Sequence, residues 1–184
     1  MGPKIEYDGH TVAITLSDSS DIVLGNTVGL EEGMRFDSLQ LGDCEILEIL
    51  NTTSFKINKT ATSDWTESVY VRKIIEFEYP PQKDDTEKLK VKKHERVSLA
   101  GVRQVSVDYI EMQQKFDFDF LPIEKINEIK NFYLEWASLG KSFFYFPDKD
   151  SAQNIEYEAR TLDLTTKRTT YRLFKVSFFW RRLA

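Results

Sequence analysis

Cysteine and histidine are almost absent from this sequence. Its 184 residues include one cysteine, Cys44, and two histidines, His10 and His94. A single cysteine cannot form an internal disulfide, and no Cys/His spacing is present that could build a zinc site. A lone cysteine in such a chain is more often a small core residue than a reactive thiol, so we expect Cys44 to be buried.

Long apolar runs are also missing. No stretch reaches the roughly 18 apolar residues that a membrane-spanning helix needs, and the first ten residues, MGPKIEYDGH, lack the apolar segment of a signal peptide. We therefore expect a chain that neither spans a membrane nor is conventionally secreted. It should be made and folded in a cytoplasm.

Basic residues are fewer than acidic residues. Lysine and arginine total 25 against 30 aspartate and glutamate, a net charge of −5. A protein that holds nucleic acid through phosphate neutralisation usually shows the opposite balance, so specific nucleic-acid binding is not expected. With 41% hydrophobic and 13% aromatic residues, the chain can bury a proper core as one domain.

Catalytic patterns are weak. Asp117 and Asp119 share one face of a predicted strand and could pair as acid and base, but the alternating phenylalanines explain them as its solvated side. The cluster around Asp18 and Asp21 lacks the spaced acidic positions and closing glutamate of a calcium loop. We predict no catalytic, cofactor-binding or metal-binding residues, and no enzyme activity.

The strongest local pattern is strand, helix, strand between residues 115 and 148. Phenylalanines alternate with charged residues from Lys115 to Phe120, as in a half-buried strand. A helix is predicted from Pro122, which suits a first turn, to a stop at Gly140. Its expected apolar face consists of Ile123, Ile126, Ile129, Tyr133, Trp136 and Ala137. The aromatic run 142–146 then predicts a second strand.

Residues 21–72 differ in sequence pattern from the residues that follow, because short apolar runs alternate with turn residues. Segments 44–50 and 54–58 predict a hairpin. The strands predicted at 11–16 and 74–79 flank this stretch, so we interpret 21–72 as a small all-β insertion in a parent domain formed by 1–20 and 73–184. The predicted fold class is α+β and mainly antiparallel β, with one amphipathic α-helix lying on a phenylalanine-rich sheet and with that insertion.

The remaining segments complete the expected sheet. A charged loop is predicted at 80–87, followed by a lysine-rich strand at 89–99. Residues 102–112 are predicted to form a hairpin with the phenylalanine strand through Gln113-Gln114. Residues 165–170 are predicted to be a turn before a last strand, in which Phe174, Val176, Phe178 and Trp180 face one way.

A resemblance is carried by the block ERVSLAGVRQVSVDYIEMQQKFDFDFLPIEKINEIKNFYLEWASLGKSFFYFPD, residues 95–148. It resembles structural proteins of tailed-bacteriophage tails, in which an S-G-V-R-Q-x-S entry, an aromatic strand, one helix ending in W-A-x-x-G-K and a Y-F-P-D strand recur. The similarity covers about the last hundred residues and part of 5–16. Ala100-Gly101 stands where the pattern has Ser-Gly.

The resemblance implies a distal-tail or other baseplate ring protein, and with it a fold in which an antiparallel β-sandwich or twisted sheet is flanked by one α-helix. Such a chain would be a structural subunit of the virion tail, form a homo-oligomeric ring, and contact tail tube and baseplate hub proteins without catalysis. Another tail station, such as tube, terminator or head-to-tail connector, stays open. So do a carbohydrate-binding module that uses Trp65 and Tyr70 to hold host-surface glycan, and a cell-wall hydrolase accessory that uses Asp117 and Asp119.

Overall fold

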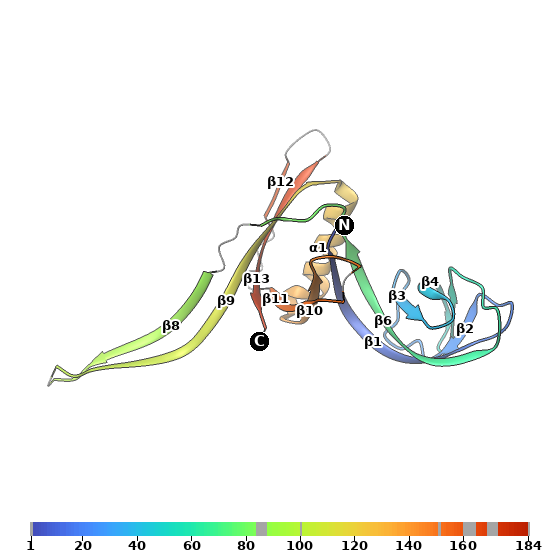
Figure 1. The fold of residues 1–184 in the computed structure, drawn as a ribbon, viewed down its shortest axis with the longest axis horizontal. Coiled ribbons are helices and arrows are strands. Elements are labelled where there is room, and N and C mark those ends of the chain that lie inside the picture. The colour runs from blue at the N-terminus through green and yellow to red at the C-terminus, as the bar shows by residue number, and fades with distance from the viewer. Residues whose placement is uncertain are drawn as a thin grey trace. The chain divides into compact units, whose positions relative to one another are not determined.

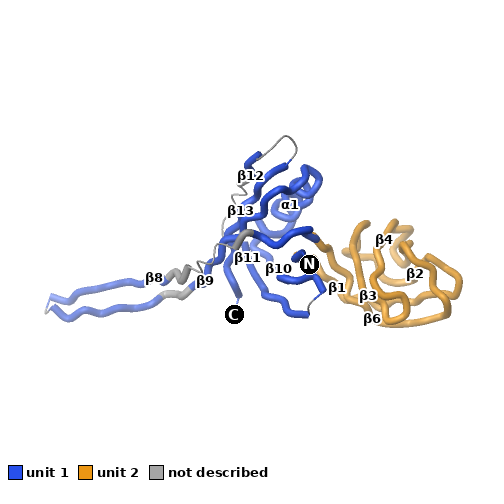
Figure 2. The backbone as a smooth tube through the Cα atoms, turned by 45° about the horizontal axis from the view of Figure 1, so that its top comes forward, with its two compact units in different colours: residues 1–4, 76–184 blue, residues 5–75 orange. Residues whose placement is uncertain are grey.

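The computed structural model of the chain describes residues 2–83, 88–99, 101–150, 152–159, 165–168 and 173–183. Its backbone divides into two compact units (Figure 2). Residues 5–75 form the first, which we call the barrel unit. Residues 1–4 and 76–184 form the second, which we call the helix unit because it contains the α-helix.

The elements in chain order are mostly strands (Figure 1). The barrel unit takes its strands from β1 (Lys4–Leu16), β2 (Ile22–Gly25), β3 (Arg35–Ser38), β4 (Gly42–Asn51), β5 (Ser54–Ile57) and β6 (Trp65–Glu76). The helix unit contains β7 (Gln82–Lys83), β8 (Lys88–Val97), β9 (Arg103–Leu121), α1 (Ile123–Glu135), η1 (Ala137–Leu139), β10 (Ser142–Phe146), β11 (Ile155–Ala159), β12 (Thr165–Arg168) and β13 (Phe174–Arg182).

The barrel unit is a closed barrel of six strands, which corrects the predicted sandwich or twisted sheet. Its strands follow the order β2-β5-β4-β3-β6-β1, and β1 pairs with β2 to close the ring. The closing pair is antiparallel and sets Leu16 opposite Val23. Closure gives every strand two neighbours and therefore leaves no bare sheet edge.

The barrel has a core of its own, which requires β1 and β6. The predicted hairpin of β4 and β5 is confirmed. The flanking strands also contribute to this core: β1 supplies Val12, Ile14 and Leu16, and β6 supplies Val69 and Val71. The buried cluster consists of Val12, Ile14, Leu16, Val23, Leu30, Met34, Phe36, Cys44, Ile46, Phe55, Ile57, Ala61, Val69 and Val71.

The sheet of the helix unit runs β10-β11-β13-β9-β7, with β12 beside β13 and β8 beside β9. Its core is aromatic. The rings of Phe116 and Trp180 lie 4.3 Å apart between centroids, and Phe77 stacks on Phe118 at 4.1 Å. The predicted inward set on the last strand is confirmed at Val176, Phe178 and Trp180, which are buried.

Helix α1 is confirmed, although its buried face differs from the predicted one. Pro122 precedes the first helical residue, and Gly140 ends the following turn with a φ of 71°. The buried residues are Ile126, Ile129, Phe132 and Tyr133. Ile123 is exposed, and Trp136 is only half-buried: its indole N–H donates to the Ser142 carbonyl at 2.7 Å.

Two predicted turns are strands in the structure. Gln113-Gln114 lies within β9, which runs unbroken from Arg103 to Leu121, and the hairpin partner of this strand is β8. Residues Thr165–Arg168 form β12, paired with β13. Within the predicted loop 80–87, Gln82–Lys83 form β7, and residues 84–87 lie outside the described residues.

Candidate assembly interface

The β8–β9 hairpin is the least covered part of the helix unit. Figure 1 shows it as a long two-stranded ribbon that extends away from the rest of this unit. The ladder runs from the Lys88–Gln113 pair to the Val97–Arg103 pair. Along 91–99 and 101–107, every residue is exposed. A two-stranded ribbon without a covering layer is only marginally stable in water. The exposed side chains of this segment are therefore available to bind a partner.

The two faces of the hairpin differ in chemistry. One face carries Val105 and Val107 on β9 with Lys93 and Glu95 opposite them on β8, and Arg103 continues it. Lys93 Nζ lies 3.0 Å from Glu95 Oε1, and Arg103 also pairs with Glu95. Hydrogen bonds from Arg103 and Lys93 lower the pKa of Glu95, so this exposed carboxylate is ionised within a basic surface.

The other face of the hairpin is polar. A shallow depression there is lined by His94, Arg96, Gln104 and Ser106, together with Val105. The tip between the strands is apolar: Val97 and Val102 are exposed, and Leu99 is fully so. A basic ribbon with an apolar tip and valines along one face is typical of a docking element and offers no catalytic group arrangement.

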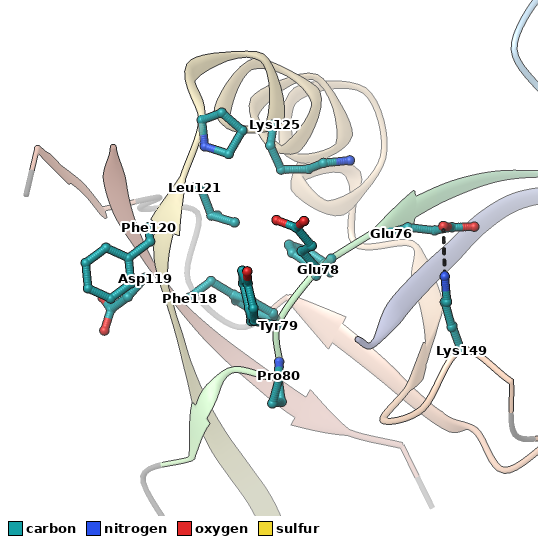
Figure 3. Close-up of a pocket in the computed structure, with 12 residues that line it drawn as sticks. Glu76, Glu78, Tyr79, Pro80, Phe118, Asp119, Phe120, Leu121, Lys125 and Lys149 are labelled. Atoms are coloured by element: carbon teal, nitrogen blue, oxygen red, sulfur yellow. Dashed lines mark ion pairs between the residues drawn. The ribbon is translucent and has the colours of Figure 1, made fainter. Parts of the chain in front are cut away.

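A cavity of about 350 Å³ lies elsewhere in the helix unit, between the segment after β6 and the end of β9 (Figure 3). Aromatic and proline side chains such as Phe118, Tyr79 and Pro80 form its walls. Lys149 Nζ lies 3.8 Å from a carboxylate oxygen of Glu76 at its edge. No histidine, cysteine or serine is among the described residues that line it.

Phe120, beside this cavity, has a backbone conformation that is rare for a large residue. Its φ is 61°, in the left-handed region that favours glycine. The register explains the distortion, because Leu121 pairs with Phe174 and Phe118 with Val176, which leaves two residues of β9 opposite one of β13. This β-bulge turns the Phe120 ring to the opposite side of β9 from Leu121, and the ring is 59% exposed (Figure 3).

The two candidate carboxylates, Asp117 and Asp119, do lie on the same side of β9, where lysines neutralise them. Lys175 Nζ lies 3.4 Å from an oxygen of each, and Lys115 Nζ lies 2.9 Å from Asp117. Burial opposes ionisation of Asp117, yet hydrogen bonds from Ser177 and Lys115 bring its pKa below the usual value. A carboxylate held ionised in this way is a poor general acid.

Cys44 is confirmed as a core residue of the barrel. It is fully buried, and burial raises the pKa of its thiol to about 11, so it carries little thiolate at neutral pH. At the candidate calcium cluster, Asp21 pairs with Lys56 at 3.1 Å. Across the described part of the chain, no group of three potential ligands could hold a metal ion.

Trp65 and Tyr70, the two aromatics suggested for glycan binding, are exposed at 43% and 47%. They stand five positions apart on β6, and alternate residues of a strand point to opposite faces. The two rings therefore cannot form a common stacking platform. This geometry weighs against the carbohydrate-binding alternative.

The chain matches no family model, no curated protein and no solved structure. Within the described residues, none of the helical segments has the length and apolarity to cross a membrane. The uncovered hairpin is therefore the feature that bears most directly on function. The sequence contains a signal for this hairpin, because valines and basic residues alternate on both sides of Leu99. A lysine-rich strand alone, however, does not distinguish an uncovered hairpin from a protected sheet edge.

Proposed function

We propose that this chain is a structural subunit of a phage tail tip or baseplate, a distal-tail-like ring component that acts in virion assembly without catalysis. The sequence resemblance over residues 95–148 motivates the class of particle. The observation that carries the assembly role is the hairpin of β8 and β9, exposed along the described residues 91–99 and 101–107.

The physical argument concerns what the hairpin lacks. Strands gain stability when a hydrophobic face packs on another layer, and here valines on both strands face solvent. A neighbouring subunit would supply that layer. Ring assembly through such an arm needs a heterologous contact in which one surface of a subunit meets a different surface of the next.

A shortened hairpin tests the assembly role. Lys90 faces Glu111 in register, so an Asn-Gly turn joining these two positions can replace residues 91–110 and keep the remaining ladder. We expect this variant to fold with an unchanged thermal transition and to fail to form oligomers or enter tails. Normal incorporation of the shortened chain would contradict the proposal.

The station along the tail is tested by imaging. Purified particles carrying a label on this chain should show it at the distal end of the tail. A label along the tube, at the terminator or at the capsid vertex would instead place the chain at another station of the particle, and absence from particles would reject the tail assignment altogether.

A further inference from the structure

Charge is segregated along this chain: the barrel unit is acidic and the hairpin is basic. The barrel unit, residues 5–75, contains twelve Asp or Glu against five Lys or Arg, a net charge of −7. The hairpin, residues 88–113, contains six Lys or Arg against three Asp or Glu, a net charge of +3. Like units repel and unlike units attract, which favours head-to-tail contact between copies.

The apolar surfaces of the two parts are also complementary. One end of the barrel exposes Leu39 at 86% and Trp65 at 43%. Hydrogen bonds tie this end together: Leu39 N donates to Glu67 at 3.0 Å, and Asp18 N donates to Asp64 at 2.9 Å. The Leu39 end thus presents two apolar side chains beside three carboxylates.

Basic charge at the Leu39 end is limited. The ammonium group of Lys59 lies near it and donates to the Leu41 carbonyl at 2.7 Å. The hairpin tip offers the matching pattern, with exposed Val97, Leu99 and Val102 between Arg96 and Arg103. Apolar contact surrounded by opposite charges is the usual composition of a specific protein interface.

We propose that the hairpin tip of one copy docks on the Leu39 end of the barrel of a second copy. This inference rests on the proposed function, since it names the partner of the assembly arm. It also goes further, because it predicts self-association from this chain alone, without other tail proteins. Repulsion between barrels and between hairpins prevents symmetric pairing and directs the subunits into a head-to-tail series.

The test uses two charge variants of the full chain. The hairpin variant is Arg96→Glu with Arg103→Glu. The barrel variant is Asp18→Lys with Asp64→Asn, in which the Asn oxygen can still accept the Asp18 N–H. A control barrel variant, Glu32→Gln with Glu48→Lys, makes the same change in net charge at exposed residues outside the Leu39 end. Thermal unfolding of each variant verifies the fold.

Sedimentation velocity over a concentration series gives the readout. The wild type and the control variant should self-associate, and each reversed variant alone should associate at least about tenfold more weakly. An equimolar mixture of the two reversed variants should regain association, because the acidic hairpin then meets the basic barrel end and the unaltered hairpin meets the unaltered barrel. Raised salt should weaken the wild-type contact.

Several outcomes would overturn this inference. A wild type that stays monomeric at all concentrations, a mixture that regains nothing, or a control that loses as much as the barrel variant would each do so. If the hairpin binds a polyanion instead, heparin retention will fall in the hairpin variant alone and mixing will restore nothing. Reversed variants that still enter tails would reject the docking contact while leaving the proposed tail function intact.

Discussion

The barrel and the β8–β9 hairpin are both antiparallel β-structure, yet they differ in how their strands are covered. In the barrel, closure between β1 and β2 gives each strand two neighbours and encloses a buried core. In the hairpin, β8 pairs only with β9 among the described residues, and the described side chains of its outer part are exposed. Each barrel strand pairs with a neighbour on both sides. In the hairpin, an open backbone edge and exposed valine side chains are available to a partner.

The largest expected contrast is in core packing. Phe36 is fully buried in the barrel, with its ring edge-on to Phe55 at 6.3 Å. Phe36→Ala should lower the free energy of unfolding of the barrel by about 3–5 kcal/mol, the range for a buried aromatic. Val105→Ala in the hairpin should change it by less than about 0.5 kcal/mol in the free subunit. Urea unfolding followed by fluorescence measures both, and similar losses would show that the hairpin is covered by its own chain.

A second contrast concerns ion pairs. Arg72 in the barrel lies between Glu6 at 2.9 Å and Asp37 at 2.8 Å, with its side chain only 12% exposed. Arg72→Ala leaves Glu6 buried without this guanidinium and should cost about 3 kcal/mol. Arg103→Ala removes an exposed pair with Glu95 and should leave the urea midpoint unchanged. A negligible loss in Arg72→Ala would mean that water reaches the pair.

The smallest contrast is in acid sensitivity, between Asp117 on β9 and Glu95 on β8. Because the folded pKa of Asp117 is below its unfolded value, its contribution to stability is present above about pH 4 and is lost as pH falls through the folded pKa. Asp117→Asn should therefore lose about 1–2 kcal/mol at neutral pH, as expected for charged hydrogen bonds, and the difference from wild type should shrink toward pH 2.

The matched control for Asp117→Asn is Glu95→Gln in the exposed hairpin. Its carboxylate also has a lowered pKa, but solvent screens the pair, so no change in the pH profile of unfolding is expected. Urea midpoints measured between pH 7 and about pH 2 give the comparison. If Asp117→Asn were less stable than wild type by the same amount at every pH, Asp117 would stabilise the fold through its shape and not through its charge.

Local patterns in the sequence predicted local structure well. The alternating phenylalanines predicted the strand, and Pro122 and Gly140 predicted where the helix starts and stops. Each of these signals acts within a few residues. Barrel closure was not predictable in this way, since the pairing of β1 with β2 depends on how the chain bends in three dimensions. Because the sequence does not reveal that bend, we interpreted segments 11–16 and 74–79 as strands of a parent sheet.

The continuity of β9 was missed for a specific reason. We predicted a turn at Gln113-Gln114, and the apolar residues do change parity between Val107 and Phe116, a pattern that a turn or a bulge can produce. The register shows a bulge instead: Lys93 pairs with Val107 and Lys92 with Tyr109, so Asp108 is the extra residue. One inserted residue moves all later side chains to the other face while the strand continues.

The central claim is that the hairpin is uncovered in the free subunit and covered in the assembly. Hydrogen–deuterium exchange of the backbone amides of residues 91–99 and 101–107, measured in dilute subunit and in purified tails, tests it most directly. The barrel amides, which we expect to exchange slowly in both states, serve as the internal reference. We predict that hairpin amides exchange at least about a hundredfold faster than barrel amides in the free subunit and become protected in tails. Equal exchange of the hairpin in the two states would contradict the account.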